Sequence, residues 1–341
     1  MASRRDAIRF AVYAAMAVSL EHGVPSSAGA QVEGPNQPSP TSRADPDASE
    51  NAYALDGVAN FKAIYGDARL RNAFYLFLKN VYNLYPEDRF HHLIDDVARG
   101  AISDRDIYNR VQKEQKLIEP FLSEVRYALP ALARQKAEMA RETLAILGSS
   151  PRIDGYMEIG TTGRYIGKLK GSVDLTGDVV LVNATEPGFS PVDLVERGQL
   201  TRIGRYVPLK DYAPITTPEV PDRSLDVVAN FIGFHHSPAD RRDAFVRSIW
   251  RVLRPGGRLI LRDHDVDSAE MNHMVALAHD VFNMGLGVPW EVNQREIRHF
   301  TSIPEIADYL GTQGFRLTTS KRPLLQPGDP THNALMEFVR V

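Results

Sequence analysis

Two adjacent histidines, His235 and His236, directly follow an apolar run, Leu225–Phe231, that is typical of a buried strand. A third histidine, His264, follows a second apolar run, Arg258–Arg262. Histidine is the side chain best suited to proton transfer near neutral pH, and open α/β sheets bind ligands beyond the carboxyl ends of their strands. We therefore predict all three histidines as catalytic candidates. The alternative, that the histidine pair only caps the strand or bonds a backbone carbonyl, stays open.

Two carboxylates flank the third histidine. Strand alternation would send Asp263 and Asp265 to one side and His264 to the other. Such a pair could hold Mg²⁺, or it could cap the next helix near Ser268. Because hard cations normally take about six oxygen ligands, we favour the cap and assign no residue to a metal.

A glycine-rich segment, Glu158–Gly163, follows a predicted strand and opens a predicted helix. Glycines there let the backbone turn tightly and approach a ligand closely. A carboxylate at Glu158 would repel phosphate but could pair with the amino group of an amino acid. This favours S-adenosylmethionine (SAM) over a dinucleotide, although a purely structural strand–turn–helix stays open.

A nicotinamide-dependent oxidoreductase is the competing enzyme class. Gly160, Gly163 and Gly167 have nearly the glycine spacing of short-chain dehydrogenases, and Tyr206 and Lys210 have the spacing of their catalytic pair. That pair must share one face of a helix. Pro208 stands between the two residues, which disfavours a helix there.

The chain alternates short apolar runs with helical stretches after Gly148, which predicts a largely parallel sheet in an α/β domain over residues 149–341. Arg241–Leu253 predicts an amphipathic helix, and Arg254–Gly257 a turn from it into the next strand. The predicted strands are Gly155–Ile159, Val179–Val182, Thr201–Val207, Leu225–Phe231, Arg258–Arg262, Phe315–Ser320 and Ala334–Arg340.

In this order the acidic glycine segment, the strand after Ser224, the His235-His236 tip, the helix and the Leu253–Gly257 turn resemble the class I SAM-dependent methyltransferases. The resemblance covers roughly residues 153–341. It implies a Rossmann-like, seven-stranded, mostly parallel sheet that ends in an antiparallel hairpin. It also implies SAM as cofactor and in-line transfer of its methyl group to an acceptor.

The resemblance also assigns cofactor-binding candidates. The glycine segment would surround the methionine end of SAM, and residues at the ends of the second, third and fourth strands would contact its ribose, adenine and sulfonium. The candidates are Glu158, Gly160, Thr161, Thr162, Gly163, Asn183, Asp211, Tyr212, Asn230 and Phe231. Two departures stand out: Thr161-Thr162 replaces the middle of the usual glycine motif, and Asn183 replaces the usual ribose-binding acid, for which Glu186 could substitute.

Composition narrows the remaining choices. The chain has no cysteine, which excludes cysteine-ligated zinc, iron–sulfur clusters and a thiol nucleophile. A net charge of −3 gives no electrostatic case for nucleic acid. The expected acceptor of the methyl group is a small molecule or an exposed side chain, and we favour the small molecule. The oligomeric state cannot be inferred. Residues 52–148 read as an α-helical domain and a candidate cap, in which the aromatic stripe of Leu70–Tyr85 is expected to be core.

The beginning of the chain has the order of a secretory signal. Arg4 and Arg5 precede an apolar run, Phe10–Leu20, and small residues around Ala30. The run is too short for a stable membrane span, so we predict export to the periplasm or beyond, with a cytoplasmic location as the alternative. Residues 31–51 read as a disordered linker. Export and the irregular glycine segment together keep a second function open: a non-catalytic binding protein on a methyltransferase fold.

Overall fold

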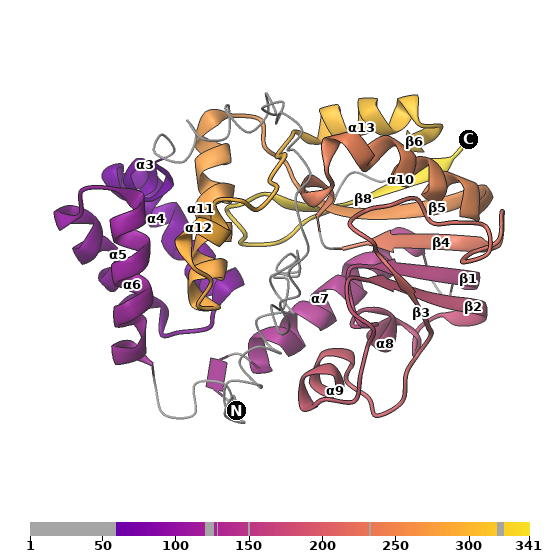
Figure 1. Ribbon diagram of the computed structural model, residues 1–341, viewed down its shortest axis with the longest axis horizontal. Helices are drawn as coiled ribbons and strands as arrows, with labels where there is room; N and C mark the ends of the chain where they lie inside the picture. Colours follow the sequence, from indigo (N-terminus) through magenta and orange to yellow (C-terminus); the bar gives the residue numbers. More distant parts are fainter. Residues whose placement is uncertain (1–58, 120–125, 128, 149–150, 232, 319–323) are drawn as a thin grey trace, which may run out of the picture.

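The computed structural model describes residues 59–119, 126–127, 129–148, 151–231, 233–318 and 324–341. The predicted signal peptide and linker lie outside these residues. Helices at one end of the molecule face a twisted sheet at the other (Figure 1). Before the sheet region come α3 (Asn60–Gly66), α4 (Ala68–Phe77), the π-helical turn η1 (Leu78–Tyr82), α5 (Glu87–Gly100), α6 (Asp104–Ile118) and α7 (Leu129–Leu147).

The sheet has the strand order β3-β2-β1-β4-β5-β8-β6, with β7 also paired to β8. Strands β1 to β5 run parallel, and β8 is antiparallel to β5, β6 and β7. This confirms the Rossmann-like sheet with its antiparallel hairpin, and β7 is an eighth strand that the sequence did not predict. The strands are β1 (Arg152–Ile159), β2 (Asp174–Asn183), β3 (Arg205–Pro208), β4 (Leu225–Asn230), β5 (Leu253–His264), β6 (Phe315–Leu317), β7 (Leu324–Leu325) and β8 (Asn333–Arg340).

The two faces of the sheet bury alternate residues of the same strands, as strand geometry requires. One face packs α10 (Ala239–Val252) and α13 (Ile303–Thr312) against side chains such as Met157 and Val228. The other face packs α7 and α8 (Ile166–Leu169) against Tyr156 and Val227, which directly precede Met157 and Val228 in their strands. The short α9 (Pro191–Arg197) and the turn η3 (Phe234–His236) complete the loops at the carboxyl ends of the strands.

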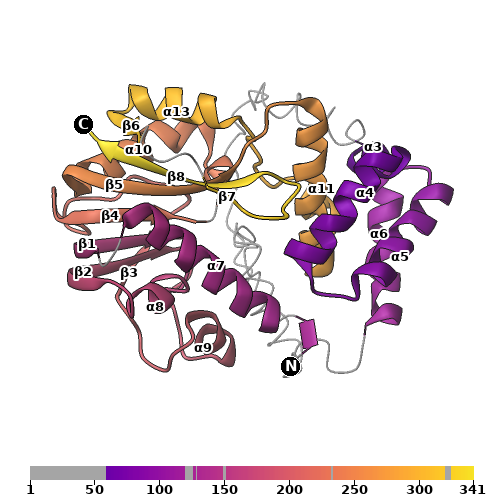
Figure 2. The same ribbon diagram turned by 180° about the vertical axis from the view of Figure 1, so that it is seen from behind.

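Helix α11 (Ala269–Gly285) follows β5 and lies between the sheet and helices α3 to α6 in both views (Figures 1 and 2). One hydrophobic core joins Phe61, Phe74 and Ile107 of the early helices to Leu277 and Val281 of α11. Trp290 of α12 (Trp290–Asn293) belongs to it as well. The early helices therefore complete their core with residues from the later half of the chain.

Two sequence-based boundaries were wrong. The aromatic stripe over Leu70–Tyr85 predicted one continuous helix, but α4 passes into the turn η1, which ends at Asn83 in the left-handed conformation (φ 41°). The aromatic side chains Phe74, Phe77 and Tyr82 are nevertheless buried, as expected. The turn predicted at Arg254–Gly257 lies inside β5, where the pairing with β4 skips from Leu253 to Arg258.

No helix among the described residues combines the length and apolar character that a membrane span needs.

Candidate active site

The turn that presents the histidine pair depends on a glycine. Gly233 follows β4 with φ 93°, a conformation that side-chain-bearing residues rarely adopt. A Cβ at this position would lie 2.4 Å from Cε1 of His235, so only glycine lets that imidazole fold back over the chain. The next three residues form η3, which places His235 and His236 at the carboxyl end of β4.

Asp263, at the end of β5, fixes His235. Its Oδ2 accepts hydrogen bonds from the backbone N–H groups of Phe234 (2.8 Å) and His235 (3.0 Å). Its Oδ1 accepts from the backbone of His264 (2.8 Å) and lies 2.6 Å from Nδ1 of His235. Burial raises the pKa of Asp263, while His264 and the backbone donors act in the opposite direction. With its oxygens occupied by donors, Asp263 acts as an acceptor, and Nδ1 of His235 carries the hydrogen.

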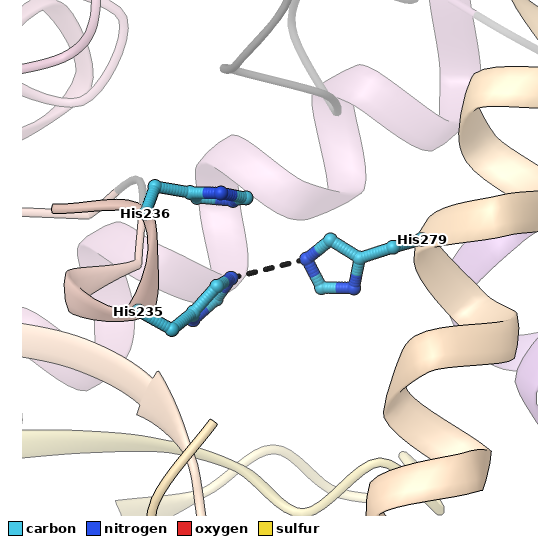
Figure 3. Close-up of side chains that lie close together, drawn as sticks. All are labelled: His235, His236 and His279. Carbon is cyan, nitrogen blue, oxygen red and sulfur yellow. Dashed lines mark hydrogen bonds between the residues drawn. The ribbon is translucent and has the colours of Figure 1, made fainter. Parts of the chain in front are cut away.

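His279, which is not among the predicted catalytic residues, lies on α11 and points toward the histidine pair (Figure 3). Its Nε2 lies 3.1 Å from Nε2 of His235, and its Nδ1 lies 3.0 Å from the carbonyl oxygen of Val275. One ligand atom from each of His235, His236 and His279 lies within 4.8 Å of the others. We call these three residues the histidine cluster. No residue was assigned to a metal from the sequence, yet this arrangement has the donors for one.

The fourth histidine, His264, closes the group. Its ring centroid lies 5.6 Å from that of His235 and 5.7 Å from that of His279, and its Nδ1 lies 2.8 Å from the carbonyl oxygen of Thr331. Both His264 and Asp263 face the same cavity, so the alternation that predicted opposite sides was wrong. The strand ends at His264, and beyond it Asp265 accepts from the backbone N–H of Ile303 (2.9 Å) at α13, not from the helix that Ser268 caps.

Burial sets the protonation of this group. It is the main cause that lowers the pKa of His236, lowers the pKa values of His235 and His279 well below the usual range, and lowers the pKa of His264 to about 4. Neighbouring histidines add to the effect on His235 and His279. The four imidazoles are therefore neutral at pH 7, which suits proton acceptors and metal ligands alike.

A buried ionic network supports the wall behind the cluster. Arg298 donates to Asp280 (2.7 Å), Glu296 (2.8 Å) and Asn293 (2.6 Å). Asp280 is completely buried and neighbours His279 on α11. Since the carboxylates have charged and amide partners, the network holds α11 in place without leaving a charge unpaired.

A cavity of about 470 Å³ opens beside the histidines, a size typical of small-ligand pockets. Its walls come from β5, the turn η3, α7, α11 and the π-helical turn η1, so both the sheet region and the helices contribute. All three predicted catalytic residues, His235, His236 and His264, line it, as do the newly found His279 and Glu296. Four further charged side chains line it: Arg134, Glu138, Arg164 and Arg262.

The glycine segment does not present its carboxylate to a ligand. Glu158 is fully buried and accepts from the hydroxyls of Tyr156 (3.0 Å) and Thr161 and from the backbone of Tyr165 (3.2 Å) and Ile166 (2.8 Å). Its carboxylate thus occupies the amino end of α8, where such a fold otherwise receives an anion. The expectation that Glu158 pairs with the amino group of SAM does not fit this geometry.

The rest of the segment is equally closed. Thr161 and Thr162 are buried, and Thr162 donates to Glu196 of α9 (2.6 Å), which also pairs with Arg164. Gly160 and Gly163 have positive φ values of 80° and 89°, and Gly160 donates to the carbonyl of Val182. These contacts give the predicted cofactor residues a structural role in the turn.

The remaining cofactor candidates are spread along the strand ends. Asn183 donates to the carbonyl of Thr185, and the exposed Glu186 pairs with Arg202 (2.7 Å). Asp211 pairs with Arg241, and Tyr212 is buried edge-on against Phe245. Asn230 is buried in register with Ile159 and Leu261. Of the ten candidates only Phe231 lines the cavity, where its ring meets Tyr165 at 4.7 Å.

The structure does not support the catalytic pair of the dehydrogenase alternative. Tyr206 lies in β3 and donates to the carbonyl of Ala184, while Lys210 has φ 48°. The two residues do not share a helix, as Pro208 had indicated.

Residues 201–261 match the family model of a methyltransferase domain. The match runs from before β3 through β4 and α10 into β5, the part of the sequence that carries most of the resemblance. No curated protein matches the chain.

Solved structures give distant likenesses. A Burkholderia thailandensis 1,6-didemethyltoxoflavin N1-methyltransferase, solved with S-adenosylhomocysteine, is 18% identical over 62% of this chain and 81% of its own, with a TM-score of 0.41. The mitomycin 7-O-methyltransferase is 18% identical over 85% of this chain and 75% of its own, with a TM-score of 0.41. A SAM-dependent methyltransferase from Aquifex aeolicus is 14% identical over 67% and 98%, with a TM-score of 0.39.

Proposed function

We propose that this chain is a class I SAM-dependent methyltransferase, as its strand order and family match support, and that it transfers a methyl group to a small-molecule acceptor held in the central cavity. The observation that carries the proposal is the position of that cavity. It lies at the carboxyl ends of β4 and β5, and several of its lining residues fall within or just after the segment that matches the methyltransferase family. Its size suits a small molecule and not a macromolecule.

The cavity wall, and not the glycine segment, fits the cofactor. Tyr165 and Phe231 meet edge to face there, and aromatic rings attract cations such as a sulfonium. Glu138 of α7 supplies a carboxylate on the same cavity for a cationic amino group. SAM would supply an electrophilic methyl group, which an acceptor attacks in line.

The chain's own residues then orient the acceptor and take up its proton. Alignment of the reacting groups can contribute about 7–11 kcal/mol in favourable cases. His264 donates through Nδ1 to the carbonyl of Thr331, so its Nε2 is the atom available to accept a proton. Helix α7 and the π-helical turn form part of the cavity wall.

Calorimetric titration of the full chain tests this proposal. We expect S-adenosylhomocysteine and SAM to bind with dissociation constants on the order of micromolar, about −8 kcal/mol, and NAD not to bind. Absence of binding by both sulfur compounds would contradict the proposal, and binding of NAD alone would support an oxidoreductase instead.

One observation favours a second function, a non-catalytic binding protein on the same fold. Glu158 is saturated by four donors, and Asn183 and Asp211 bond to their own chain. This function would be supported if the chain does not bind SAM and if a small molecule binds in the cavity without competition from S-adenosylhomocysteine.

We also propose export of the chain, on the basis of the basic start and the short apolar run within residues 1–30. Mass spectrometry of the protein from its native cells should then find a mature amino terminus near residue 31. An intact Met1 or Ala2 terminus would contradict export by cleavage.

A further inference from the structure

The hydrogen bonds of the histidine cluster fix which nitrogen of each ring carries the hydrogen. Nδ1 of His236 lies 3.0 Å from the carbonyl oxygen of Ile297, and Nδ1 of His279 lies 3.0 Å from that of Val275. A carbonyl oxygen only accepts, so both Nδ1 atoms are donors. Nδ1 of His235 likewise donates to Asp263 (2.6 Å). Each neutral ring therefore has its lone pair on Nε2.

Two of these lone pairs meet. Nε2 of His235 and Nε2 of His279 are 3.1 Å apart, and neither atom has a hydrogen to offer in the neutral tautomers. Either a proton or a metal cation must lie between them. A single proton would link only these two rings, whereas a metal cation could also take the third imidazole, because a ligand atom of His236 lies within 4.8 Å of those of His235 and His279.

A metal cation meets these requirements. We propose that His235, His236 and His279 bind a divalent transition metal ion through their Nε2 atoms, with zinc the best fit, and leave one coordination position open toward the cavity. Three imidazoles with a fourth position for water or a ligand are an established zinc donor set. Imidazole nitrogens favour zinc, copper, iron and nickel over magnesium.

The dimensions agree with the proposal. Zn–N bonds of about 2.0–2.1 Å in a tetrahedral site separate two ligand nitrogens by about 3.3 Å. The His235–His279 distance of 3.1 Å is close to that value. The ligand atoms of the whole cluster lie within 4.8 Å of one another, so the third nitrogen is at most about 1.5 Å beyond the separation of a tetrahedral site.

The surroundings of the rings are those of a supported metal site. Metal-bound histidines commonly donate their second nitrogen to a carboxylate or a backbone carbonyl, which fixes the ring and strengthens its donor atom. Here Asp263, Ile297 and Val275 supply one such acceptor for each ring. The ring of Phe300 packs 4.9 Å from His235 and 5.2 Å from His279, which shields the cluster on one side.

Zinc binding to the full chain, prepared without a polyhistidine tag and dialysed against a chelator, tests the site. We expect calorimetry with ZnCl₂ to give about one ion per chain, and CoCl₂ to give the visible absorption of a tetrahedral nitrogen site. MgCl₂ should not compete. A zinc stoichiometry far below one would overturn the proposal and leave a shared proton between the rings.

Variants assign the ligands. His279→Gln and His236→Gln should each weaken zinc binding by more than about 100-fold, whereas His92→Gln, at an exposed histidine on α5, should leave it unchanged. Asp263→Asn removes a positioning residue and should weaken binding by about 10–100-fold. Unchanged zinc affinity in both folded ligand variants would overturn the proposal. Circular dichroism checks that each variant folds. If one ligand variant does not fold, the zinc affinity of the other decides the test.

Discussion

Replacing Arg298 by methionine is expected to lower the free energy of unfolding by about 3–5 kcal/mol, because it leaves buried carboxylates without their charged partner. Asp280 is completely buried and Glu296 nearly so, and both pair with the guanidinium of Arg298. Neighbouring carboxylates raise the pKa of Arg298, so the arginine keeps its charge in the interior although burial opposes it. Urea denaturation followed by circular dichroism measures the loss.

Arg316→Met is the matched control, since Arg316 is exposed on β6 and its replacement should change stability by less than about 0.5 kcal/mol. If Arg298→Met is as stable as the control, the ionic network does not hold α11. Loss of the Arg298 partner of Glu296 should also disturb the cavity, because Glu296 forms part of its wall.

Replacing Glu158 by alanine should cost at least about 3 kcal/mol in the absence of any ligand. The substitution leaves two hydroxyl donors, on Tyr156 and Thr161, and two backbone donors, on Tyr165 and Ile166, without their acceptor in the interior. Each orphaned buried donor costs about 1–3 kcal/mol, although the losses are not additive. Urea denaturation of the ligand-free variant checks this expectation.

Glu186→Ala serves as the control, because its ion pair with Arg202 is exposed and such pairs contribute about 0–1 kcal/mol. A loss below about 1 kcal/mol in Glu158→Ala would show that Glu158 does not hold the turn together. That result would favour the sequence-based expectation that the Glu158 carboxylate of the unmodified chain serves a cofactor.

The sheet could be predicted because its strands are apolar runs with clear ends. Leu225–Phe231 matches β4 to within a residue, and Arg241–Leu253 matches α10 to within two. β2 begins at Asp174, five residues before the predicted strand, because its first half is polar and largely exposed and so lacks the apolar signal. β7 has two residues, too few for any periodicity.

The site could be predicted only in part. The three histidines at strand ends follow from the rule that ligands bind at the carboxyl edge. His279 could not be placed, because it lies in an apolar helix 44 residues from His235 in the sequence and only tertiary packing brings them together. One signal was present: His279 and Asp280 are polar residues within the buried stretch of α11, and buried polar groups require partners.

The shared core of the early helices and α11 constrains how the chain is made. Asn60 bonds to Asp280, 220 residues later, and Tyr108 bonds to the carbonyl of Val288, 180 residues later. While a ribosome synthesises the intervening sheet, the part of the apolar surface of α3 to α6 that α11 later covers has no partner within the nascent chain. Long-range contacts of this kind slow folding and expose surface to aggregation. The helices that emerge first from the ribosome therefore complete their packing only after α11 has been synthesised.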